Sequence, residues 1–344
     1  MQRVELTVDV TSACDLDRSL TIAATAYLPP AARLEANQSV VFALPGGGYS
    51  RGYYDMHFEG HAGYSQAEHH VERGLILVAI DHLGVGDSTP EVADALRIED
   101  IAAANHAAVQ QIVDHLREGT LADGYPAVDV GARIGVGQSM GGGVTVIMAA
   151  RHETYDAVAV LGYSGIHTVL PQRSAEDAQY VEKFDYTRDD GPENLSKEAS
   201  AAAIPDFLYP FHYEDVPADI VEADISGGYP LRETSPPFGS KSLPLCVVAM
   251  LSPGYISDEA AALTIPVFVG LGERDTAPEP HREPAAYRSS PDVSMYVVER
   301  MAHMHNFAST RKKLWDRLVA WYGAVSADHV GASSSRRAEF AGRR

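Results

Sequence analysis

The sequence has 344 residues, 45% of them hydrophobic and 22% charged, so the chain is long and apolar enough to bury a sizeable core. Its formal net charge of -20 argues against binding to nucleic acid or to an anionic membrane, because both require a basic surface. The sequence shows no charged-then-apolar leader and no apolar run that could span a membrane. Its two cysteines, Cys14 and Cys246, lie far apart without metal-site spacing, so we expect a cytoplasmic protein with reduced thiols; a single disulfide is the alternative.

Strands and helices alternate along the first half of the chain. Short runs rich in β-branched or apolar residues predict strands at residues 4–10, 19–28, 39–44, 75–80, 132–139 and 155–165. Helices are predicted at residues 99–117, from apolar side chains that repeat with helical period, and at 140–152. This alternation predicts the α/β class, with a mostly parallel central sheet flanked by helices.

The alternation stops between residues 167 and 257. From residue 171 to 224 the chain carries fourteen Asp and Glu residues against four Lys and Arg, and the wider segment carries Tyr180, Tyr186, Tyr209, Tyr213 and Tyr229. A long irregular stretch inside a compact domain is usually functional, and its aromatic content argues against disorder. We therefore predict an inserted cap at 167–257, a core made of 1–166 and 258–326, and a mobile basic tail at 327–344.

Regular elements resume after this predicted cap. Strands are expected at residues 265–275 and 293–302, a helical stretch at 280–288 and a closing helix at 310–322. Before the cap, the segment 57–70 holds four histidines, which we interpret as a solvated helix face because no carboxylate or cysteine stands at metal-ligand spacing. No metal ion and no cofactor is expected.

One serine lies within a run of glycines directly after a predicted strand. Residues 135–143 have the sequence GVGQSMGGG, in which Gly137, Ser139 and Gly141 form a G-x-S-x-G pattern between a strand and a helix. Small residues two positions before and after the serine allow strand and helix to pack closely around a strained turn. The pattern therefore predicts an exposed, nucleophilic Ser139, although a simple Ser-Gly helix cap is the alternative.

A serine hydroxyl needs a base, and the base needs a carboxylate that orients it. In the strand–serine–helix arrangement these partners follow in the order acid, then histidine, each after a later strand. Asp275 ends the predicted strand at 265–275, and His303 follows the strand at 293–302. His305 lies two residues further on and competes for the role of base; we prefer His303 and expect His305 to be a packed or solvated loop residue.

The glycines after the strand at 39–44 suggest where a negative oxygen could be held. The sequence LPGGGYS lets the backbone approach a substrate closely, and backbone N–H groups stabilise the oxyanion of acyl transfer. We expect the donors to be the N–H groups of Gly47, Gly48 and Met140. A flexible glycine turn is the alternative.

With these motifs together, the chain resembles the α/β-hydrolase superfamily on its serine esterase and lipase side. The residues PGGGY resemble that family's HGGG-type loop, and DHLGVGDS resembles its D-x-x-G-x-G-x-S segment. The resemblance covers about residues 40–164 and 263–322, and it implies the α/β-hydrolase fold with an inserted cap. Pro45 departs from it, because it stands where the family loop usually has a histidine that braces the loop.

The resemblance and the three residues predict an esterase with the triad Ser139, Asp275 and His303. Its expected partner is a small to medium, partly apolar ester, cleaved through an acyl-enzyme, with Tyr49, Gln138 and Tyr209 as substrate-binding residues. Thioester, lactone or C–C bond hydrolysis and acyl transfer use the same triad and remain open. A ligand-binding protein without catalysis is the alternative of a different class. The sequence leaves a homodimer open.

Overall fold

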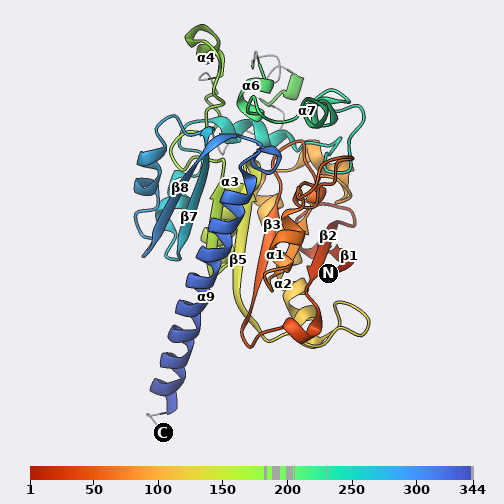
Figure 1. The fold of residues 1–344 in the computed structure, drawn as a ribbon, viewed down its shortest axis with the longest axis vertical. Coiled ribbons are helices and arrows are strands. Elements are labelled where there is room, and N and C mark those ends of the chain that lie inside the picture. Colours follow the sequence, from red (N-terminus) through yellow and green to blue (C-terminus); the bar gives the residue numbers. More distant parts are fainter. Residues whose placement is uncertain (182–183, 188–193, 199–203, 205, 230, 342–344) are drawn as a thin grey trace.

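The computed structural model describes residues 1–181, 184–187, 194–198, 204, 206–229 and 231–341. Its centre is an eight-stranded sheet in the order β1-β2-β4-β3-β5-β6-β7-β8 (Figure 1). The strands are β1 Gln2–Asp9, β2 Thr21–Leu28, β3 Gln38–Leu44, β4 Ile76–Ile80, β5 Val130–Gln138, β6 Ala157–Leu161, β7 Val267–Arg274 and β8 Val293–Ala302. All eight strands expected from the sequence are present, within a few residues of the predicted ends.

The directions of the strands indicate the edge of the sheet at which a ligand site is expected. β1, β2 and β4 pair antiparallel in that order, whereas every pair from β4 through β3 to β8 is parallel. The chain passes from β3 to β4 on one side and then returns to β5 on the other side of β3. In open parallel sheets, ligands bind beyond the carboxyl ends of strands at such a reversal, which here lies between β3 and β5.

Helices cover both faces of the sheet and bury two apolar cores. Along β3, Val40, Phe42 and Leu44 belong to one core, and Val41 and Ala43 to the other, because side chains alternate along a strand. The helices of the first core are α2 Ile98–Glu118, α3 Met140–His152 and α8 Ser257–Ala262. Those of the second are α1 Gln66–Val71 and α9 Arg311–Ala341. The predicted α/β class with flanking helices is confirmed.

Helix α2 shows how well the apolar periodicity predicts burial. The side chains expected on one face are all nearly inaccessible to solvent: Ile101, Ala104, Ala108, Ile112 and Leu116. The helix ends at Gly119, whose φ of 70° is the left-handed conformation that glycine adopts without strain. Its observed bounds extend the predicted range of 99–117 by one residue at each end.

Two expectations about helices differ from the structure. The stretch at 280–288 forms a 3-10 helix, Pro280–Ala286, because Pro284 within it lacks the N–H of a regular α-helix. The closing helix α9 runs to Ala341, through the segment for which a mobile tail is predicted. That segment lacks proline, and its glycines and serines weaken a helix without ending it, so the helix continues beyond residue 322. The tail's mobility stays a prediction.

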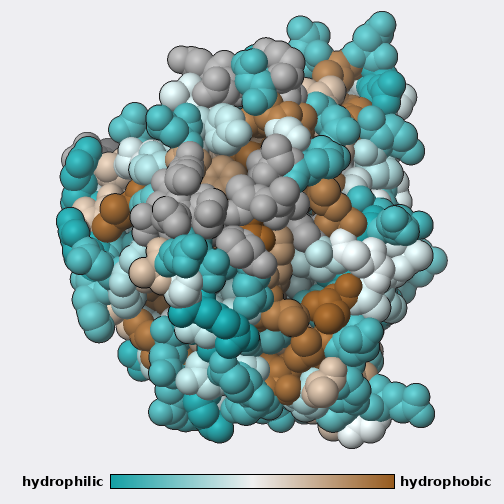
Figure 2. Space-filling model, turned by 90° about the horizontal axis from the view of Figure 1, so that it is seen from above, coloured by the Kyte–Doolittle hydropathy of each residue, from teal (hydrophilic) through white to brown (hydrophobic). Residues whose placement is uncertain are grey.

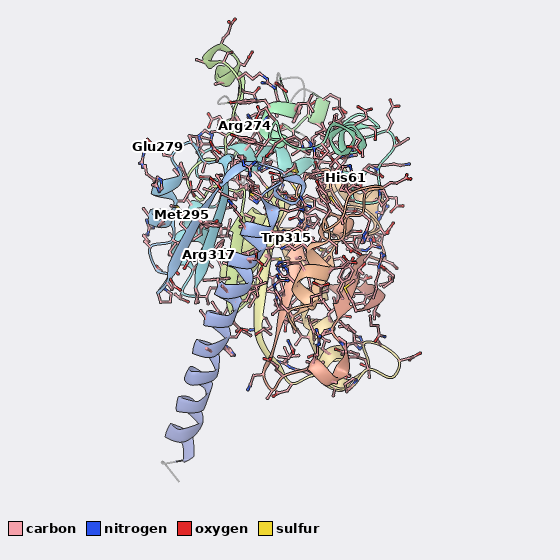
Figure 3. The ribbon with its side chains drawn as sticks, in the orientation of Figure 1. His61, Arg274, Glu279, Met295, Trp315 and Arg317 are labelled. Atoms are coloured by element: carbon pink, nitrogen blue, oxygen red, sulfur yellow. The ribbon has the colours of Figure 1, made fainter. Side chains whose placement is uncertain are left out.

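The four histidines before β4 do not form one solvated helix face, because the exposed His57 and partly exposed His61 precede α1 and the two within α1 are buried. His69 and His70 of α1 are 8% and 0% exposed, and the His69 ring packs against Trp315 of α9, which Figure 3 labels. Their burial follows from α1 being held between the sheet and α9. Within the described ranges, no group of three or more histidine, cysteine or acidic side chains is arranged to hold a metal ion.

The segment 167–257, which we call the cap segment, contains short helices that lie over the carboxyl ends of the parallel strands (Figure 1). They are α4 Ala175–Val181, α6 Leu208–Phe211, α7 Ala218–Ile225 and the 3-10 helix η6 Leu245–Leu251. Seen from above, this face is largely hydrophilic with interspersed hydrophobic patches (Figure 2). Division into core and cap domains stays a prediction. Among the described helices, none combines the length and apolar character that crossing a membrane requires.

Candidate active site

Ser139 occupies a strained turn between β5 and α3. Its φ of 54° and ψ of -122° are rare for a residue with a side chain and cost about 1–3 kcal/mol. The flanking glycines make this turn possible: a Cβ on Gly137 would lie 2.0 Å from the Gly141 carbonyl oxygen, and one on Gly141 would lie 2.2 Å from the Leu44 carbonyl oxygen. The steric reason that the sequence suggested for these two glycines is therefore correct.

The next two glycines serve the packing of α3. A Cβ on Gly142 would lie 3.1 Å from the Tyr163 Cβ, beyond the end of β6. A Cβ on Gly143 would lie 2.4 Å from the Met250 Cε and 3.0 Å from the Tyr163 ring. These glycines thus let α3 approach both the sheet and η6 of the cap segment.

Three side chains from three strand ends meet in a continuous hydrogen-bonded chain. Ser139 follows β5, Asp275 follows β7 and His303 follows β8. His303 Nε2 lies 2.9 Å from Ser139 Oγ, and His303 Nδ1 lies 2.7 Å from Asp275 Oδ1. An ionised Asp275 can only accept, so Nδ1 carries the proton and the Nε2 lone pair faces the serine hydroxyl. This arrangement can remove a proton from Ser139.

The environment of Asp275 favours its ionised form. Burial alone would raise the pKa of this carboxyl, but the neighbouring His305 and hydrogen bonds from His303 and His305 hold the pKa below its ordinary value. Its two oxygens also accept backbone N–H groups, from Thr276 at 2.8 Å and Gly272 at 2.9 Å. With all four bonds made, the carboxylate is both charged and fixed in orientation.

His305 is a buried partner of Asp275. Its Nε2 lies 2.6 Å from Asp275 Oδ2, and its ring is 1% exposed. His303 alone of the two is hydrogen-bonded to Ser139 within the described chain, as the sequence led us to prefer. Sequence reasoning expected a loop histidine and missed this contact, although the His-x-His spacing after a strand was the available signal.

Gly162, at the end of β6, was also missed. Its φ of +59° belongs to the left-handed region, and a Cβ there would lie 3.0 Å from His303 Nδ1 and 3.4 Å from Asp275 Oδ1. Thr276 Oγ1 donates to the Gly162 carbonyl at 2.9 Å and fixes this strand end. A glycine here gives the imidazole and the carboxylate room to meet.

The glycine loop after β3 lies beside Ser139, and hydrogen bonds hold its carbonyl groups in place. The Leu44 carbonyl accepts from the Tyr54 hydroxyl at 2.7 Å, and the Pro45 carbonyl accepts from His82 Nε2 at 2.9 Å. The Gly46 carbonyl accepts from the Tyr49 N–H at 3.2 Å, and the Gly47 carbonyl accepts from the Tyr229 hydroxyl at 3.2 Å. The Gly48 carbonyl accepts from the Ser240 N–H at 3.0 Å and from Arg232 Nε at 3.3 Å. Because a peptide unit is planar and trans, each hydrogen bond that holds a carbonyl also fixes the direction of the N–H in the same unit.

Of the expected donors, Gly47 and Met140 are at the site. Both line the same cavity as Ser139, and Met140 is the first residue of α3, where no helical carbonyl is available to its N–H. Gly48 is outside that lining; its φ of +80° turns the chain, and a Cβ there would lie 2.9 Å from the Tyr229 ring. The structure therefore places two of the three expected groups at the serine.

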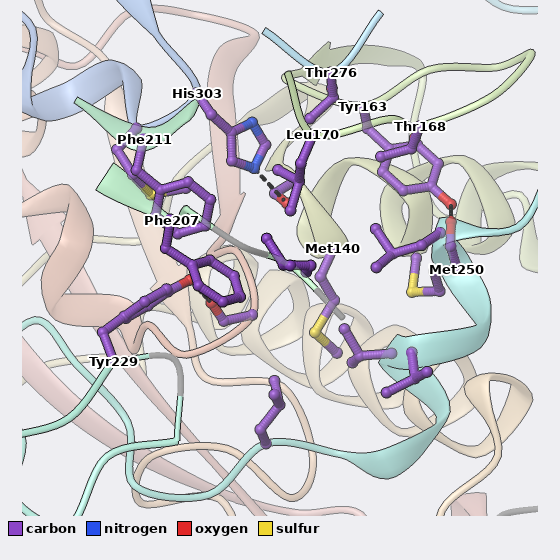
Figure 4. Close-up of a pocket in the computed structure, with 18 of the residues that line it drawn as sticks. Met140, Tyr163, Thr168, Leu170, Phe207, Phe211, Tyr229, Met250, Thr276 and His303 are labelled. Carbon is purple, nitrogen blue, oxygen red and sulfur yellow. Dashed lines mark hydrogen bonds between the residues drawn. The ribbon is translucent and has the colours of Figure 1, made fainter. Parts of the chain in front are cut away.

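A cavity of about 110 Å³ opens at Ser139 and His303 (Figure 4). Figure 4 shows the rings of Phe207, Phe211 and Tyr229 on one side of His303, with Met140 and Met250 on the other. Most of its other lining residues are apolar; they include Leu170, Ile204, Leu231, Leu243, Val247, Val248 and Leu251. Many of them belong to the cap segment, so that segment supplies much of the apolar wall over the serine.

The expected substrate-binding residues lie elsewhere. Among the described residues, the cavity lining includes none of Tyr49, Gln138 and Tyr209. The Tyr49 hydroxyl donates to Asp224 at 2.8 Å, and Gln138 Nε2 donates to the His303 carbonyl at 2.9 Å. Tyr209 stacks under the guanidinium of Arg274, which is 4.0 Å from its ring centre and is labelled at the cap side in Figure 3.

The cap segment is joined directly to the histidine loop. His303 N–H donates to the Pro210 carbonyl at 2.8 Å, and Met304 N–H donates to the Phe211 carbonyl at 3.1 Å. The Phe211 ring packs on the His303 ring with centres 5.4 Å apart. These contacts place α6 beside the imidazole, where it limits the approach of water.

No protein-family model matches this sequence, and no curated protein matches it. Solved structures match over most of their length. The chain is 16% identical to a thermophilic esterase from Thermogutta terrifontis, over 93% of this chain and 99% of that chain, with a TM-score of 0.61. It is 11% identical to a peroxisomal alpha-beta-hydrolase from Saccharomyces cerevisiae, over 94% and 87% of the two chains, with a TM-score of 0.59.

The chain has the α/β-hydrolase fold. A haloalkane dehalogenase variant from Bradyrhizobium elkanii also shares it, at 14% identity over 96% of this chain and 99% of that chain, with a TM-score of 0.57. The names of these α/β-hydrolase-fold proteins cover different activities. The fold is therefore compatible with several reactions, and the reaction has to be argued from the residues at the site.

Proposed function

We propose that this protein is a serine hydrolase that cleaves a carboxylic ester of a small to medium, partly apolar substrate through an acyl-enzyme. The observation that carries the proposal is the hydrogen-bonded chain from Ser139 through His303 to Asp275, at the mouth of an apolar cavity. A buried carboxylate on one imidazole nitrogen and a hydroxyl on the other is the arrangement that activates a serine.

In the proposed first step, Ser139 Oγ forms a bond to the ester carbonyl carbon while His303 Nε2 takes the hydroxyl proton. Asp275 stabilises the resulting imidazolium. The N–H groups of Gly47 and Met140 hold the negative oxygen, and the loss of one such donor would raise the barrier by about 3 kcal/mol. His303 then gives the proton to the leaving alkoxide as the bond between carbon and alcohol oxygen breaks.

In the second step, water replaces the alcohol. His303 Nε2 takes a proton from the water as its oxygen attacks the acyl carbon, and the same proton returns to Ser139 Oγ when the acid leaves. The balance is one ester and one water consumed, with one acid and one alcohol released. Because the proton only moves between Ser139, His303 and substrate, the site needs no redox partner.

The cavity favours a neutral, apolar group of limited size. Its volume of about 110 Å³ is somewhat smaller than the engineered protein cavity of about 150 Å³ that holds benzene. Lys197 is the lining residue with a cationic side chain in the described set, and its ammonium is bonded to Asp94 at 2.5 Å and to the Leu243 carbonyl at 3.2 Å. Because Asp94 already offsets the charge of that ammonium, the wall attracts a substrate carboxylate less strongly than an unpaired lysine would.

The proposal is tested with p-nitrophenyl esters of increasing acyl length, together with a thioester and a lactone because the same residues can act on them. We expect turnover of short neutral esters by the parent and its loss in Ser139→Ala. Ser174→Ala, which removes an exposed hydroxyl of the cap segment, is the matched control and keeps parent activity. Equal rates for the parent and Ser139→Ala would overturn the proposal.

A further inference from the structure

His82 reaches the glycine loop from a different strand. It follows β4, and its Nε2 lies 2.9 Å from the carbonyl oxygen of Pro45, the first residue of the loop after β3. Proline has no N–H, so this carbonyl is the only backbone hydrogen-bonding group that Pro45 offers. The bond from His82 is therefore the direct means of orienting that peptide group.

The surroundings of His82 select the ring proton. The ring is 0% exposed, and its Nδ1 lies 2.8 Å from Asn105 Nδ2. Asn105 Oδ1 accepts the Leu83 N–H at 3.4 Å, which turns the amide so that its NH₂ group faces the imidazole. Nδ1 then accepts, and Nε2 carries the proton that it donates to Pro45. Burial lowers the pKa of His82 to about 4, so the ring is neutral near pH 7.

The bond to Pro45 controls one of two peptide planes that meet at the Gly46 α-carbon. The plane before it contains the Pro45 carbonyl, held by His82; the plane after it contains the Gly46 carbonyl, held by the Tyr49 N–H at 3.2 Å. The Gly47 N–H belongs to the second plane. Glycine has no side chain to restrict its rotation, so both planes must be held from outside to fix this N–H.

We propose that His82 is a positioning residue: by holding the peptide plane between Pro45 and Gly46, it helps to fix the adjoining plane that carries the Gly47 N–H, the proposed oxyanion donor. This inference rests on the proposed function. His82 does not line the described cavity and acts through the loop, without touching substrate. Asn105 supports it by holding the tautomer. A displacement of about 1 Å in such a donor can lower a rate on the order of a hundredfold. The hydrogen bond from His82 to Pro45 therefore affects the rate of the proposed reaction.

The test uses two amides that differ by one methylene. In His82→Gln the side-chain NH₂ can reach the position of imidazole Nε2, whereas in His82→Asn it reaches only that of Nδ1. We expect His82→Asn to lower kcat about tenfold to a hundredfold with little change in KM, and His82→Gln to restore most of the loss. His106→Asn is the matched control: it is adjacent to Asn105 but bonds Thr154 at 2.9 Å, and it keeps parent kcat.

A second readout separates positioning from general destabilisation. The carbonyl stretching frequency of an acyl group on Ser139 falls when N–H donors polarise it, so we expect a higher frequency in His82→Asn than in the parent and in His82→Gln. A boronic acid that mimics the tetrahedral intermediate should bind more weakly in proportion to the loss in kcat/KM, with product binding unchanged.

The parent itself supplies a measurement that does not depend on a variant's folding. Nitrogen NMR of labelled histidine should show His82 neutral with the proton on Nε2. Finding the proton on Nδ1 would put a lone pair against the Pro45 carbonyl and overturn the inference, as would parent kcat in a folded His82→Asn. If the parent neither hydrolyses esters nor forms an acyl-serine, it is the proposed function that fails, a result distinct from these two.

Discussion

His305 is bound to the same carboxylate that orients His303. Its Nε2 lies 2.6 Å from Asp275 Oδ2, while His303 Nδ1 lies 2.7 Å from the other oxygen. Both rings are buried, so water does not compete for either bond. A rotation of the carboxylate that shortened its hydrogen bond to one histidine would break the hydrogen bond to the other. The orientation of the proposed base therefore depends on a second histidine that does not bond to Ser139.

Replacing His305 should reduce turnover without removing it. We expect His305→Leu to lower kcat about tenfold, because the carboxylate loses one of its fixing bonds and His303 is oriented less well. His305→Gln can still donate to Oδ2 and should stay near the parent. Steady-state kinetics on a short ester checks both variants. Equal loss in His305→Leu and His305→Gln would show that the hydrogen bond is not the reason.

Asp275 should link stability to pH. Its pKa lies below the ordinary 3.8 because the effects of His305 and His303 exceed that of burial. At a pH between these two pKa values, the Asp275 carboxyl is protonated in the unfolded chain and ionised in the folded protein. The free energy of unfolding therefore falls as the pH drops below the ordinary value, by up to about 1.4 kcal/mol per pH unit from this group. Asp275→Asn lacks this contribution.

Urea unfolding of the parent and Asp275→Asn between about pH 3 and 5 measures the difference. We expect the parent's unfolding free energy to decrease more steeply on acidification than that of the variant. Parallel curves would mean that the carboxylate is no more acidic in the folded protein than in the unfolded chain.

The ion pair between Asp224 and Arg232 is buried at both ends. Arg232 lies 2.9 Å from Asp224 Oδ1, and neither side chain is exposed. Removing Arg232 leaves the Asp224 carboxylate buried without its guanidinium, with hydrogen bonds to Tyr49 and His212 remaining, so Arg232→Leu should lower the free energy of unfolding by about 3–5 kcal/mol. Arg282→Ala, which removes an exposed pair with Glu279, is the control and should change it by less than about 0.5 kcal/mol.

A double-variant cycle decides whether the buried pair is the cause. Arg232→Leu combined with Asp224→Asn should cost less than the sum of the two single changes, because no uncompensated charge remains. Additive losses in urea unfolding would assign the destabilisation to lost packing.

Gly143 and Met250 should set the size of substrate that fits. A Cβ on Gly143 would lie 2.4 Å from Met250 Cε, the movable end of a cavity-lining side chain. Gly143→Ala should push that end into the cavity and shift the preferred acyl chain to shorter esters, whereas Met250→Ala should shift it to longer ones. The kcat/KM values for esters of two to eight acyl carbons measure the shift. Movement of both variants in the same direction would contradict this assignment.

Local pattern and chain order were sufficient to predict the centre of the site. Gly137 and Gly141 flank Ser139 between a strand and a helix, the arrangement that a serine nucleophile on this turn requires. Parallel strands bring Asp275 and His303 to the same edge of the sheet. Each of these residues follows its own strand, so a correct strand prediction places the side chain.

The surroundings of the site could not be predicted in the same way. Phe207 and Phe211 belong to a segment without periodicity, and their place over His303 follows from packing of distant parts of the chain. Tyr49 is next to the glycine loop in sequence, but its hydroxyl turns toward Asp224, 175 positions away. The bond from His82 to Pro45 likewise joins residues from two strands. Such contacts depend on tertiary structure and leave no local signal.

The proposed reaction requires that Ser139 be an activated nucleophile. The most direct measurement is the intact mass of the protein after incubation with a small fluorophosphonate, for the parent and for Ser139→Ala, followed by peptide mapping. We predict one adduct on the parent, located on Ser139, and none on the variant. An unmodified, folded parent, or an adduct that persists in Ser139→Ala, would contradict it.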